Sequence, residues 1–314
     1  MKASVFVKQN KAKFLELREV ARPGIADNQV LIKVKTVSLN AADYRSIKMG
    51  IVPDGRIMGS DVAGEIVAIG KNVHAFQIGD AVVGDLSGCG FGGLAEYVAA
   101  PEDALVRIPP NVSDETAAAL PMASVTALQA LVNVGKVQAG QNVLLCGAGG
   151  GVGMFAVQLA KHFGANVTAV CGQKNVDVIR SLGADTVIDY ALEDFAKSAR
   201  RYDLVLVLNG NRSLSSYRRV MASTGMCVMV GGSLNQLIKF MLFRPFLSLG
   251  KKRMRLLSAK PSAADLEFVL KLVEEGKLVV KIDKRFELQD TPVAIDYLSE
   301  GHAGGKVIIT VDQY

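Results

Sequence analysis

The sequence predicts an α/β protein with two domains, a barrel-like β domain and a doubly wound parallel sheet. Its 314 residues suffice for two domains of ordinary size. A composition of 50% hydrophobic and 21% charged residues excludes a disordered chain. Two observations give the class. Before Pro109 and Pro110 the chain reads as short strands separated by glycine and proline, and after them strands alternate with helices.

The first domain is predicted from seven strand-like runs. The run over 30–39 is the clearest, because it is rich in β-branched residues and partly alternates between apolar and polar ones. Turn signals such as Pro53-Asp54-Gly55 separate the runs, and many short strands at this spacing indicate a barrel. The expected strands are 3–7, 14–20, 30–39, 62–69, 81–84, 94–98 and 105–108.

The second domain is predicted from the alternation that follows. A helix over 114–132 begins after the cap residue Ser113, and its second segment starts at Pro121. From Val152 apolar residues recur at helical spacing along one face. The expected strands are 143–146, 167–171, 186–188, 204–208 and 227–230, with helices from 152, near 175–182, and at 192–200 and 213–222.

The tail returns to a mixed pattern, with helices at 264–275 and 292–299 and strands at 285–288 and 307–311. We interpret this tail as completing the first domain. One domain is then expected from 1–112 and 263–314, and the other, inserted, from 113–262, which leaves a cleft between two bodies.

Charge and cysteine content narrow the function classes. The net charge of +6 comes from scattered residues apart from Lys251, Lys252, Arg253 and Arg255, so no nucleic-acid partner is expected. Four widely spaced cysteines and three histidines predict neither a local metal site nor a disulfide framework. The chain opens directly into a strand-like run without a signal-peptide core, and its apolar stretches are interrupted, so we expect a cytoplasmic protein.

The segment over 141–153 is glycine-rich and predicts a dinucleotide site. It contains no strict GxGxxG, but Ala148, Gly150 and Gly153 stand in that register. A strand precedes it, a helix follows, and a second strand ends about 20 residues on. Glycine there allows close approach of a pyrophosphate, and the helix N-terminus offers free N–H groups. The alternative interpretation is a flexible turn.

The end of the second strand of this domain favours NADPH over NADH. An NAD site places an acidic residue there to bind the ribose 2′-hydroxyl. The chain has Gly172-Gln173-Lys174-Asn175 instead, and its first acid is Asp177, inside the helix. Lys174 is therefore expected to pair with a 2′-phosphate, the alternative being a solvated lysine at the start of a helix.

Several motifs together resemble the medium-chain dehydrogenase/reductase superfamily, in particular its zinc-free quinone oxidoreductase branch. Examples are Asn40-Ala41-Ala42-Asp43 and Leu182-Gly183-Ala184-Asp185. The similarity runs along nearly the whole chain, over 40–43, 59–65, 78–80, 92–98, 120–128, 182–190 and 304–307. The resemblance implies a GroES-like β-barrel catalytic domain, a Rossmann domain, NADPH as cofactor and a homodimer.

The resemblance also assigns site residues. Asn40, Asp43 and Tyr44 match the catalytic side, although a buried structural hydrogen bond is the alternative for Asp43 and a packed or surface position for Tyr44. Thr126 and the glycines after the fifth strand match the nicotinamide end, with the same structural alternative for Thr126, and Lys306 matches a basic residue directed toward the phosphates. The full cofactor set is Thr126, Ala148, Gly150, Gly151, Val152, Gly153, Gly172, Lys174, Tyr190, Gly231, Gly232, Ser233 and Lys306.

Two departures from the family pattern direct the choice of reaction. Zinc-dependent members carry cysteine at the position of Asn40 and Gly-His-Glu at Gly59-Ser60-Asp61, so no metal is expected here. Enoyl reductases usually place a tyrosine just after the loop glycine, where this chain has Gly50-Ile51. The missing metal disfavours oxidation of an alcohol, and the missing tyrosine disfavours dedicated reduction of enoyl thioesters. Reduction of a quinone or of an α,β-unsaturated ketone or aldehyde is therefore expected, with Asn40 donating a hydrogen bond to the substrate oxygen.

Other interpretations stay open. A zinc-free alcohol or aldehyde dehydrogenase and a non-catalytic NADPH-binding sensor fit the same motifs. Cys89, in a glycine-rich loop expected to border the cleft, is either a reactive thiol or a spectator. The apolar segment 237–249 looks too apolar and too interrupted for a simple surface helix. It is interpreted as a substrate lid or subunit interface, with contact to a membrane surface as the less favoured alternative.

Overall fold

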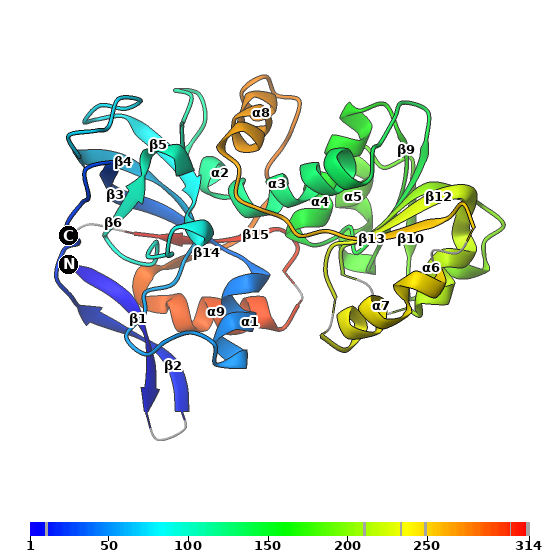
Figure 1. The fold of residues 1–314 in the computed structure, drawn as a ribbon, viewed down its shortest axis with the longest axis horizontal. Coiled ribbons are helices and arrows are strands. Elements are labelled where there is room, and N and C mark those ends of the chain that lie inside the picture. The colour runs from blue at the N-terminus through cyan, green and yellow to red at the C-terminus, as the bar shows by residue number, and fades with distance from the viewer. Residues whose placement is uncertain (10–11, 210–211, 233, 248–249, 302, 312–314) are drawn as a thin grey trace. The chain divides into compact units, whose positions relative to one another are not determined.

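The computed structural model describes residues 1–9, 12–209, 212–232, 234–247, 250–301 and 303–311. The chain forms two compact units (Figure 1). Unit 1 comprises Met1–Val125, Lys260–Gly276 and Val280–Tyr314, and unit 2 comprises Thr126–Ala259 and Lys277–Val279. Helix α2 (Asp114–Ala118), which follows the expected boundary at 112/113, packs on strands of unit 1. The expected division at 112/113 and 262/263 stays a prediction.

Unit 1 is built on a seven-stranded sheet with the order β14-β15-β3-β4-β5-β7, in which β6 also pairs with β3. All pairs are antiparallel except β14 with β15. A separate antiparallel pair, β1–β2, completes the unit. The strands are β1 (Lys2–Gln9), β2 (Ala12–Glu19), β3 (Gln29–Leu39), β4 (Asp61–Ile69), β5 (Ala81–Asp85), β6 (Tyr97–Pro101), β7 (Leu105–Arg107), β14 (Ile282–Glu287) and β15 (Lys306–Thr310).

The helices of unit 1 are α1 (Ala41–Met49), α2, α8 (Ala263–Glu274), α9 (Thr291–Ser299) and the first half of α3 (Pro121–Leu128). Ser113 accepts a hydrogen bond from Thr116 N–H and caps α2, as expected from the sequence. Helix α1 was not expected. It begins after Asn40, and the Asp43 carboxylate three residues on accepts the Asn40 N–H, half of a capping box.

Unit 2 contains a six-stranded parallel sheet with the order β10-β9-β8-β11-β12-β13. The order 3-2-1-4-5-6 is that of a doubly wound sheet, which is the type of sheet that the sequence predicts. Figure 1 shows α4 and α5 on one side of the sheet and α6 and α7 on the other. The elements are β8 (Asn142–Cys146), α4 (Gly151–His162), β9 (Asn166–Cys171), α5 (Val176–Ser181), β10 (Thr186–Asp189), β11 (Tyr202–Val207), α6 (Leu214–Val220), β12 (Met221–Met229), α7 (Leu234–Leu247) and β13 (Arg253–Leu256).

Two expectations about unit 2 need correction, and one of its strands was not expected. The helix expected over 192–200 is only a 3₁₀ turn at Phe195–Lys197, because Asp194 caps that turn and the backbone is extended again at Ser198. The basic cluster contains an edge strand, β13, whose Met254 is buried. The segment judged too interrupted for a surface helix does contain helix α7.

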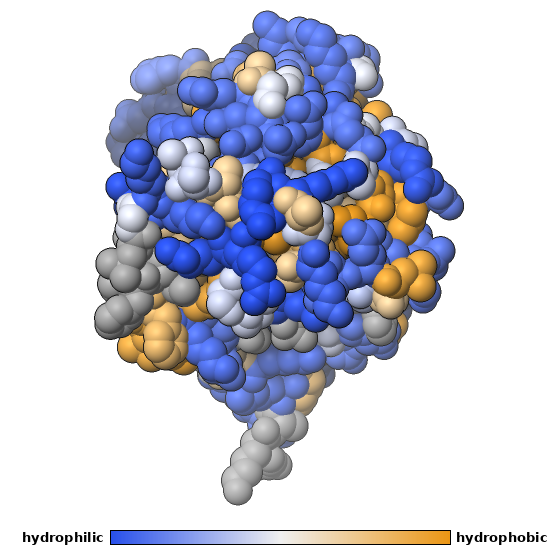
Figure 2. Space-filling view, turned by 90° about the vertical axis from the view of Figure 1, so that its right-hand side faces the viewer, coloured by the Kyte–Doolittle hydropathy of each residue, from blue (hydrophilic) through white to orange (hydrophobic). Residues whose placement is uncertain are grey.

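Helix α7 leaves four apolar side chains largely exposed, namely Ile238, Met241, Leu242 and Phe243, while Phe240 is buried. Figure 2 shows that the face it views is mostly hydrophilic and that apolar surface gathers in smaller patches. In the described part of the chain no helix is long and apolar enough to cross a bilayer. The lid, interface and membrane interpretations of this segment stay predictions.

Candidate cofactor and active site

The glycine-rich turn connects β8 to α4 at the carboxyl edge of the parallel sheet. Gly150 caps α4, and Met154 N–H donates the first hydrogen bond of the helix to the Gly150 carbonyl (3.0 Å). The N–H groups of Gly151, Val152 and Gly153 precede that bond, so a helix of twelve residues presents them at its positive end.

Two glycines of this turn are required by close packing. A Cβ on Gly153 would lie 2.5 Å from the Ala148 backbone, so only glycine lets the helix start this close to the strand. Gly147 has a φ of 94° and lies against Asn209, which follows β11. The turn therefore occupies the point between β8 and β11 where strand order reverses, the usual ligand site of such sheets.

The end of β9 forms an uncharged corner beside a cation. A Cβ on Gly172 would lie 2.8 Å from the Tyr190 hydroxyl, and Tyr190 itself is 60% exposed. Lys174 is exposed in the 3₁₀ turn Gln173–Asn175. The nearest acid in sequence, Asp177, forms an ion pair of 3.0 Å with Arg180. The residues expected to surround a 2′-phosphate are thus close to one another.

The other expected cofactor residues lie as follows. Gly231 follows β12, and its N–H donates to the Val207 carbonyl at the end of β11 (3.2 Å). Gly232 has a φ of 156°, and Ser233 lies outside the described residues. Thr126 is half-buried in α3. Their predicted contacts with a nicotinamide stay predictions.

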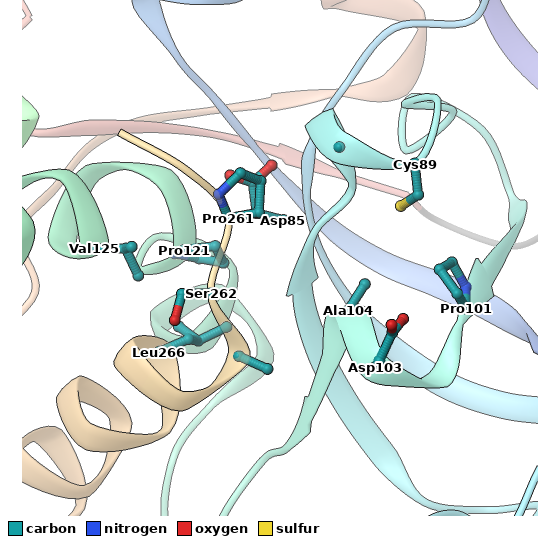
Figure 3. Close-up of a pocket in the computed structure, with 12 residues that line it drawn as sticks. Asp85, Cys89, Pro101, Asp103, Ala104, Pro121, Val125, Pro261, Ser262 and Leu266 are labelled. Carbon is teal, nitrogen blue, oxygen red and sulfur yellow. The ribbon is translucent and has the colours of Figure 1, made fainter. Parts of the chain in front are cut away.

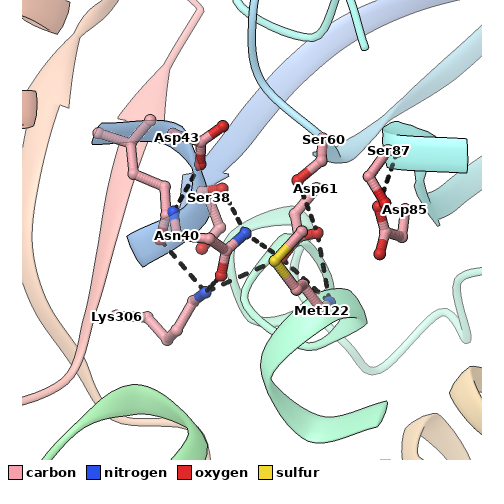
Figure 4. A network of polar contacts seen from close by, with 10 residues as sticks. Ser38, Asn40, Asp43, Ser60, Asp61, Asp85, Ser87, Met122 and Lys306 are labelled. Carbon is pink, nitrogen blue, oxygen red and sulfur yellow. Dashed lines mark hydrogen bonds and ion pairs between the residues drawn. The ribbon is translucent and has the colours of Figure 1, made fainter. Parts of the chain in front are cut away.

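Unit 1 holds a buried polar cluster centred on Asn40, Asp61 and Lys306 (Figure 4). The Lys306 Nζ donates to Asn40 Oδ1 (2.6 Å) and to the Leu39 carbonyl (3.3 Å). Asn40 Nδ2 donates to Asp61 Oδ2 (2.9 Å), and Met122 N–H at the start of α3 donates to both Asp61 oxygens (3.2 Å). Lys306 Nζ lies 3.8 Å from Asp61 Oδ2. The two amide ends of Asn40 thus connect a cation to an anion.

The register of the strands explains this meeting. Val307 pairs with Leu39, which brings Lys306 beside Asn40, and Ser38 pairs with Asp61, which pairs in turn with Asp85. Cross-strand partners present their side chains on the same face of a sheet. Polar residues distant in sequence therefore form one row across β3, β4 and β5. The Ser38 hydroxyl in this row is buried with no partner among the described residues.

Burial changes the acidity of the cluster. It raises the pKa of Asp61 to about 7, against the lowering effects of the Lys306 charge and the Asn40 hydrogen bond. It raises the pKa of Asp43 to about 6, although the Asn40 N–H lowers it. Desolvation lowers the pKa of Lys306. Burial therefore disfavours the charged forms of Asp61 and Lys306, and their attraction to each other opposes this effect.

The three expected catalytic residues have different environments. Asn40 lies within the cluster. Asp43 is buried, and its carboxylate accepts a hydrogen bond of 2.7 Å from the Asn40 backbone N–H. Tyr44 is half-buried, packs against the apolar core of unit 1 and lies 5.7 Å from both the Arg45 and Lys48 cationic groups. Lys306, expected near the phosphates, is 4% exposed and bonds Asn40. Its phosphate contact stays a prediction.

A pocket of about 200 Å³ opens in unit 1 beside Asp85 (Figure 3). Asp85, Cys89 and Asp103 line it together with Pro121 and Val125 of α3 and Ser262 at the N-terminus of α8. Burial raises the pKa of the Cys89 thiol, and the charges of Asp85 and Asp103 raise it further, which disfavours the reactive thiolate.

Sequence reasoning missed Asp61, Asp85 and Asp103 as site residues. Asp61 is part of the motif Gly59-Ser60-Asp61, and the signal available for it was a carboxylate at the start of an otherwise apolar strand. Asp85 and Asp103 gave none, because only the folded loops bring them to a common pocket.

The donor set does not fit a catalytic zinc. Among the described residues, no group of three histidine, cysteine or acidic side chains is placed to hold a metal ion. Asn40 and Ser60 occupy two of the positions where zinc-dependent relatives carry cysteine and histidine. The Lys306 ammonium donates to Asn40 Oδ1 (2.6 Å), so a cation already binds the oxygen that Asn40 could offer to a metal ion.

Comparison with known families gives the class that this fold and site define. Residues 26–110 match the alcohol dehydrogenase GroES-like domain, and residues 182–309 match the zinc-binding dehydrogenase family. The protein is a two-domain dehydrogenase/reductase with a GroES-like domain and a Rossmann domain, which confirms the expected fold class.

Individual relatives specify the branch. The chain is 37% identical to a chloroplast envelope quinone oxidoreductase homolog of Arabidopsis thaliana over 94% of this chain and 93% of the relative. It is 34% identical to the trans-enoyl reductase pgmF of Aspergillus terreus, over 92% and 88%. The structure of a Coxiella burnetii quinone oxidoreductase superposes with a TM-score of 0.89 at 30% identity, covering 99% of both chains. The chain belongs to the medium-chain dehydrogenase/reductase superfamily and is quinone oxidoreductase-like. It is an oxidoreductase of small molecules that uses a nicotinamide cofactor.

Proposed function

We propose that the protein transfers hydride from NADPH to a quinone or to the β-carbon of an α,β-unsaturated carbonyl, without a metal. The observation that carries the choice of cofactor is the corner after β9, which has no acidic residue over 172–175 and where Lys174 is exposed. A carboxylate there would repel a 2′-phosphate, whereas an ammonium forms a charge-assisted hydrogen bond with it.

The glycine-rich turn fits a pyrophosphate by the same reasoning. The N–H groups at the start of α4 would bind it, and Gly153 keeps the helix close to β8. When bound, the dihydronicotinamide supplies a hydride. The homodimer that the resemblance implies and the cytoplasmic location expected from the sequence are part of this proposal.

On the substrate side, Asn40 would donate to the acceptor oxygen as negative charge develops there. Its Nδ2 forms one strong hydrogen bond, to Asp61, and a long one of 3.4 Å to the Ser38 carbonyl, and the second N–H is the one a substrate oxygen would take over. Lys306 fixes which way the amide faces, because its ammonium accepts no hydrogen bond and must bind Oδ1.

Reduction without a metal follows from the same groups. Oxidation of an alcohol needs strong polarisation of its oxygen, which a zinc ion supplies in related enzymes. A conjugated carbonyl or quinone is already electrophilic, so positioning and one hydrogen bond suffice. The relatives named quinone oxidoreductase, trans-enoyl reductase and 2-methylene-furan-3-one reductase support this class of acceptor.

The test is a panel of quinones and enones followed by the loss of NADPH absorbance, in parallel with NADH. Wild type should prefer NADPH. Lys174→Gln should lower kcat/KM for NADPH about tenfold, the value of one exposed charge-assisted contact, and change kcat/KM for NADH less than twofold. Lys239→Gln, an exposed lysine on α7, is the matched control. Equal loss with both cofactors would reject the role of Lys174, and no turnover with any acceptor would reject the activity.

A further inference from the structure

The pocket in unit 1 adjoins the polar cluster on two sides. Asp85 lines the pocket and pairs across the sheet with Asp61, and Pro121 lines it next to Met122, whose N–H binds Asp61. Its volume of about 200 Å³ is below the 300–1,000 Å³ of most ligand sites, so it suits a small molecule of one ring or a short chain.

The charge of the pocket wall has one sign. Among the described residues that line it, Asp85 and Asp103 are charged and none is basic. Figure 3 shows both carboxylates and the Cys89 sulfur around the same space. The Arg56 guanidinium donates to the Gly90 carbonyl next to Cys89, and Arg56 is not among the residues that line the pocket.

Two helix N-termini face this region, and their positive ends must be weighed against the carboxylates. At α3 the Met122 N–H is already bound to Asp61, and at α8 the Asp265 N–H is bound to the Ser262 hydroxyl. A helix end carries about half a unit charge before such neutralisation. Two full carboxylates therefore dominate, and the pocket potential is negative.

We infer that this pocket holds the part of the electron acceptor beyond the carbonyl that Asn40 binds, and that Asp85 and Asp103 restrict the acceptor to uncharged or cationic compounds, excluding acceptors with a carboxylate beside the reactive double bond. The inference rests on the proposed function and names the substrate class within it. At distances of several ångströms and an intermediate dielectric, each carboxylate should disfavour an anion about fivefold, roughly 1 kcal/mol, and the two together about 25-fold.

Cys89 allows the potential to be measured without turnover, because it is the exposed cysteine, whereas Cys146, Cys171 and Cys227 are buried. Its alkylation rates with neutral iodoacetamide and anionic iodoacetate are compared, and the ratio is divided by the same ratio for 2-mercaptoethanol. The same thiolate attacks both reagents and displaces iodide, so the effect of thiol acidity cancels in the ratio. Loss of labelling in Cys89→Ser assigns the signal.

The normalised ratio should be about 25 in wild type, about 5 in Asp103→Asn, and unchanged in Glu16→Gln. Glu16 lies on β2 of the same unit, outside the pocket wall. A wild-type ratio near 1, or a ratio that Asp103→Asn leaves unchanged, would overturn the negative potential.

Turnover tests the substrate class itself. The methyl ester of 4-oxopent-2-enoate should be reduced with a kcat/KM at least tenfold above that of the free carboxylate, and Asp103→Asn should narrow the gap. Equal rates for the two would overturn this inference and leave the proposed function standing. If neither ester nor quinones are reduced, the proposed function fails, while the alkylation ratio still reports on the pocket.

Discussion

Replacing Lys306 by methionine removes the one cation of the buried cluster and keeps most of the side-chain volume. Asp61, which is fully buried, then retains hydrogen bonds from Asn40, Met122 and Ser60 but loses its counter-charge. At 3.8 Å and an effective dielectric of 20 the lost attraction is about 4 kcal/mol. Breaking a buried pair generally costs about 3–5 kcal/mol. With three donors left on the carboxylate, we expect a loss of about 3 kcal/mol at pH 8.

The loss should depend on pH in a defined direction. The pKa of Asp61 is already raised to about 7 in the fold, and loss of the ammonium raises it further. A carboxyl whose pKa is higher in the folded than in the unfolded state destabilises the fold above that pKa and is relieved as pH falls toward its unfolded value near 4. The cost of Lys306→Met should therefore be smaller at pH 5.5 than at pH 8.

Urea unfolding followed by circular dichroism measures both values; the chain has no tryptophan to report by fluorescence. The control is Lys35→Met; the Lys35 side chain is 43% exposed, and its ammonium pairs with Glu65 and Asp114 at 3.6 and 3.7 Å. It should cost less than about 1 kcal/mol at either pH. An equal cost of Lys306→Met at pH 5.5 and 8 would show that Asp61 is not the group left uncompensated.

Two further substitutions test the packing of unit 2. Gly153→Ala would bring a Cβ to 2.5 Å from the Ala148 backbone and should weaken NADPH binding at least tenfold, as measured by the quenching of cofactor fluorescence. The control Gly24→Ala, with open space around the residue, should leave the affinity unchanged. Equal affinities of the two variants for NADPH would contradict the close approach of α4 to β8. Gln158→Leu removes both hydrogen bonds between the Gln158 side chain and the Val279 backbone (2.7 and 3.0 Å) and should lower the free energy of unfolding in urea by about 2 kcal/mol. The control Gln289→Leu, at an exposed residue, should cause no measurable change. An unchanged unfolding midpoint in Gln158→Leu would refute a stabilising role of these two hydrogen bonds.

What could be predicted from the sequence was local and periodic. The parallel sheet of unit 2 followed from the alternation of strands and helices, and the cap at Ser113 and the start at Pro121 are short-range signals. Helix α1 was missed although Asn40 and Asp43 stand at capping spacing, because both were assigned to chemistry instead. At 192–200, burial of Phe195 against Tyr217, with ring centroids 5.8 Å apart, accompanies a short turn rather than a helix.

The site could be predicted only in part for a physical reason. The backbone conformation that binds a pyrophosphate depends on consecutive residues, so the turn at 147–153 can be predicted from the local sequence. The cluster of Asn40, Asp61 and Lys306 depends on two strand registers, of which the one between β15 and β3 joins residues more than 200 positions apart. No spacing rule connects them, and the same is true of Asp85 and Asp103.

The cost of this cluster is itself an argument about its purpose. A buried ion pair is often no more stable than apolar side chains of similar volume, and each charge here is desolvated. What apolar residues cannot supply is an amide held in one orientation, with Lys306 on its oxygen and Asp61 on its nitrogen. An oriented N–H is what an acceptor oxygen gaining charge requires, so the buried charges are better explained by that hydrogen bond than by stability.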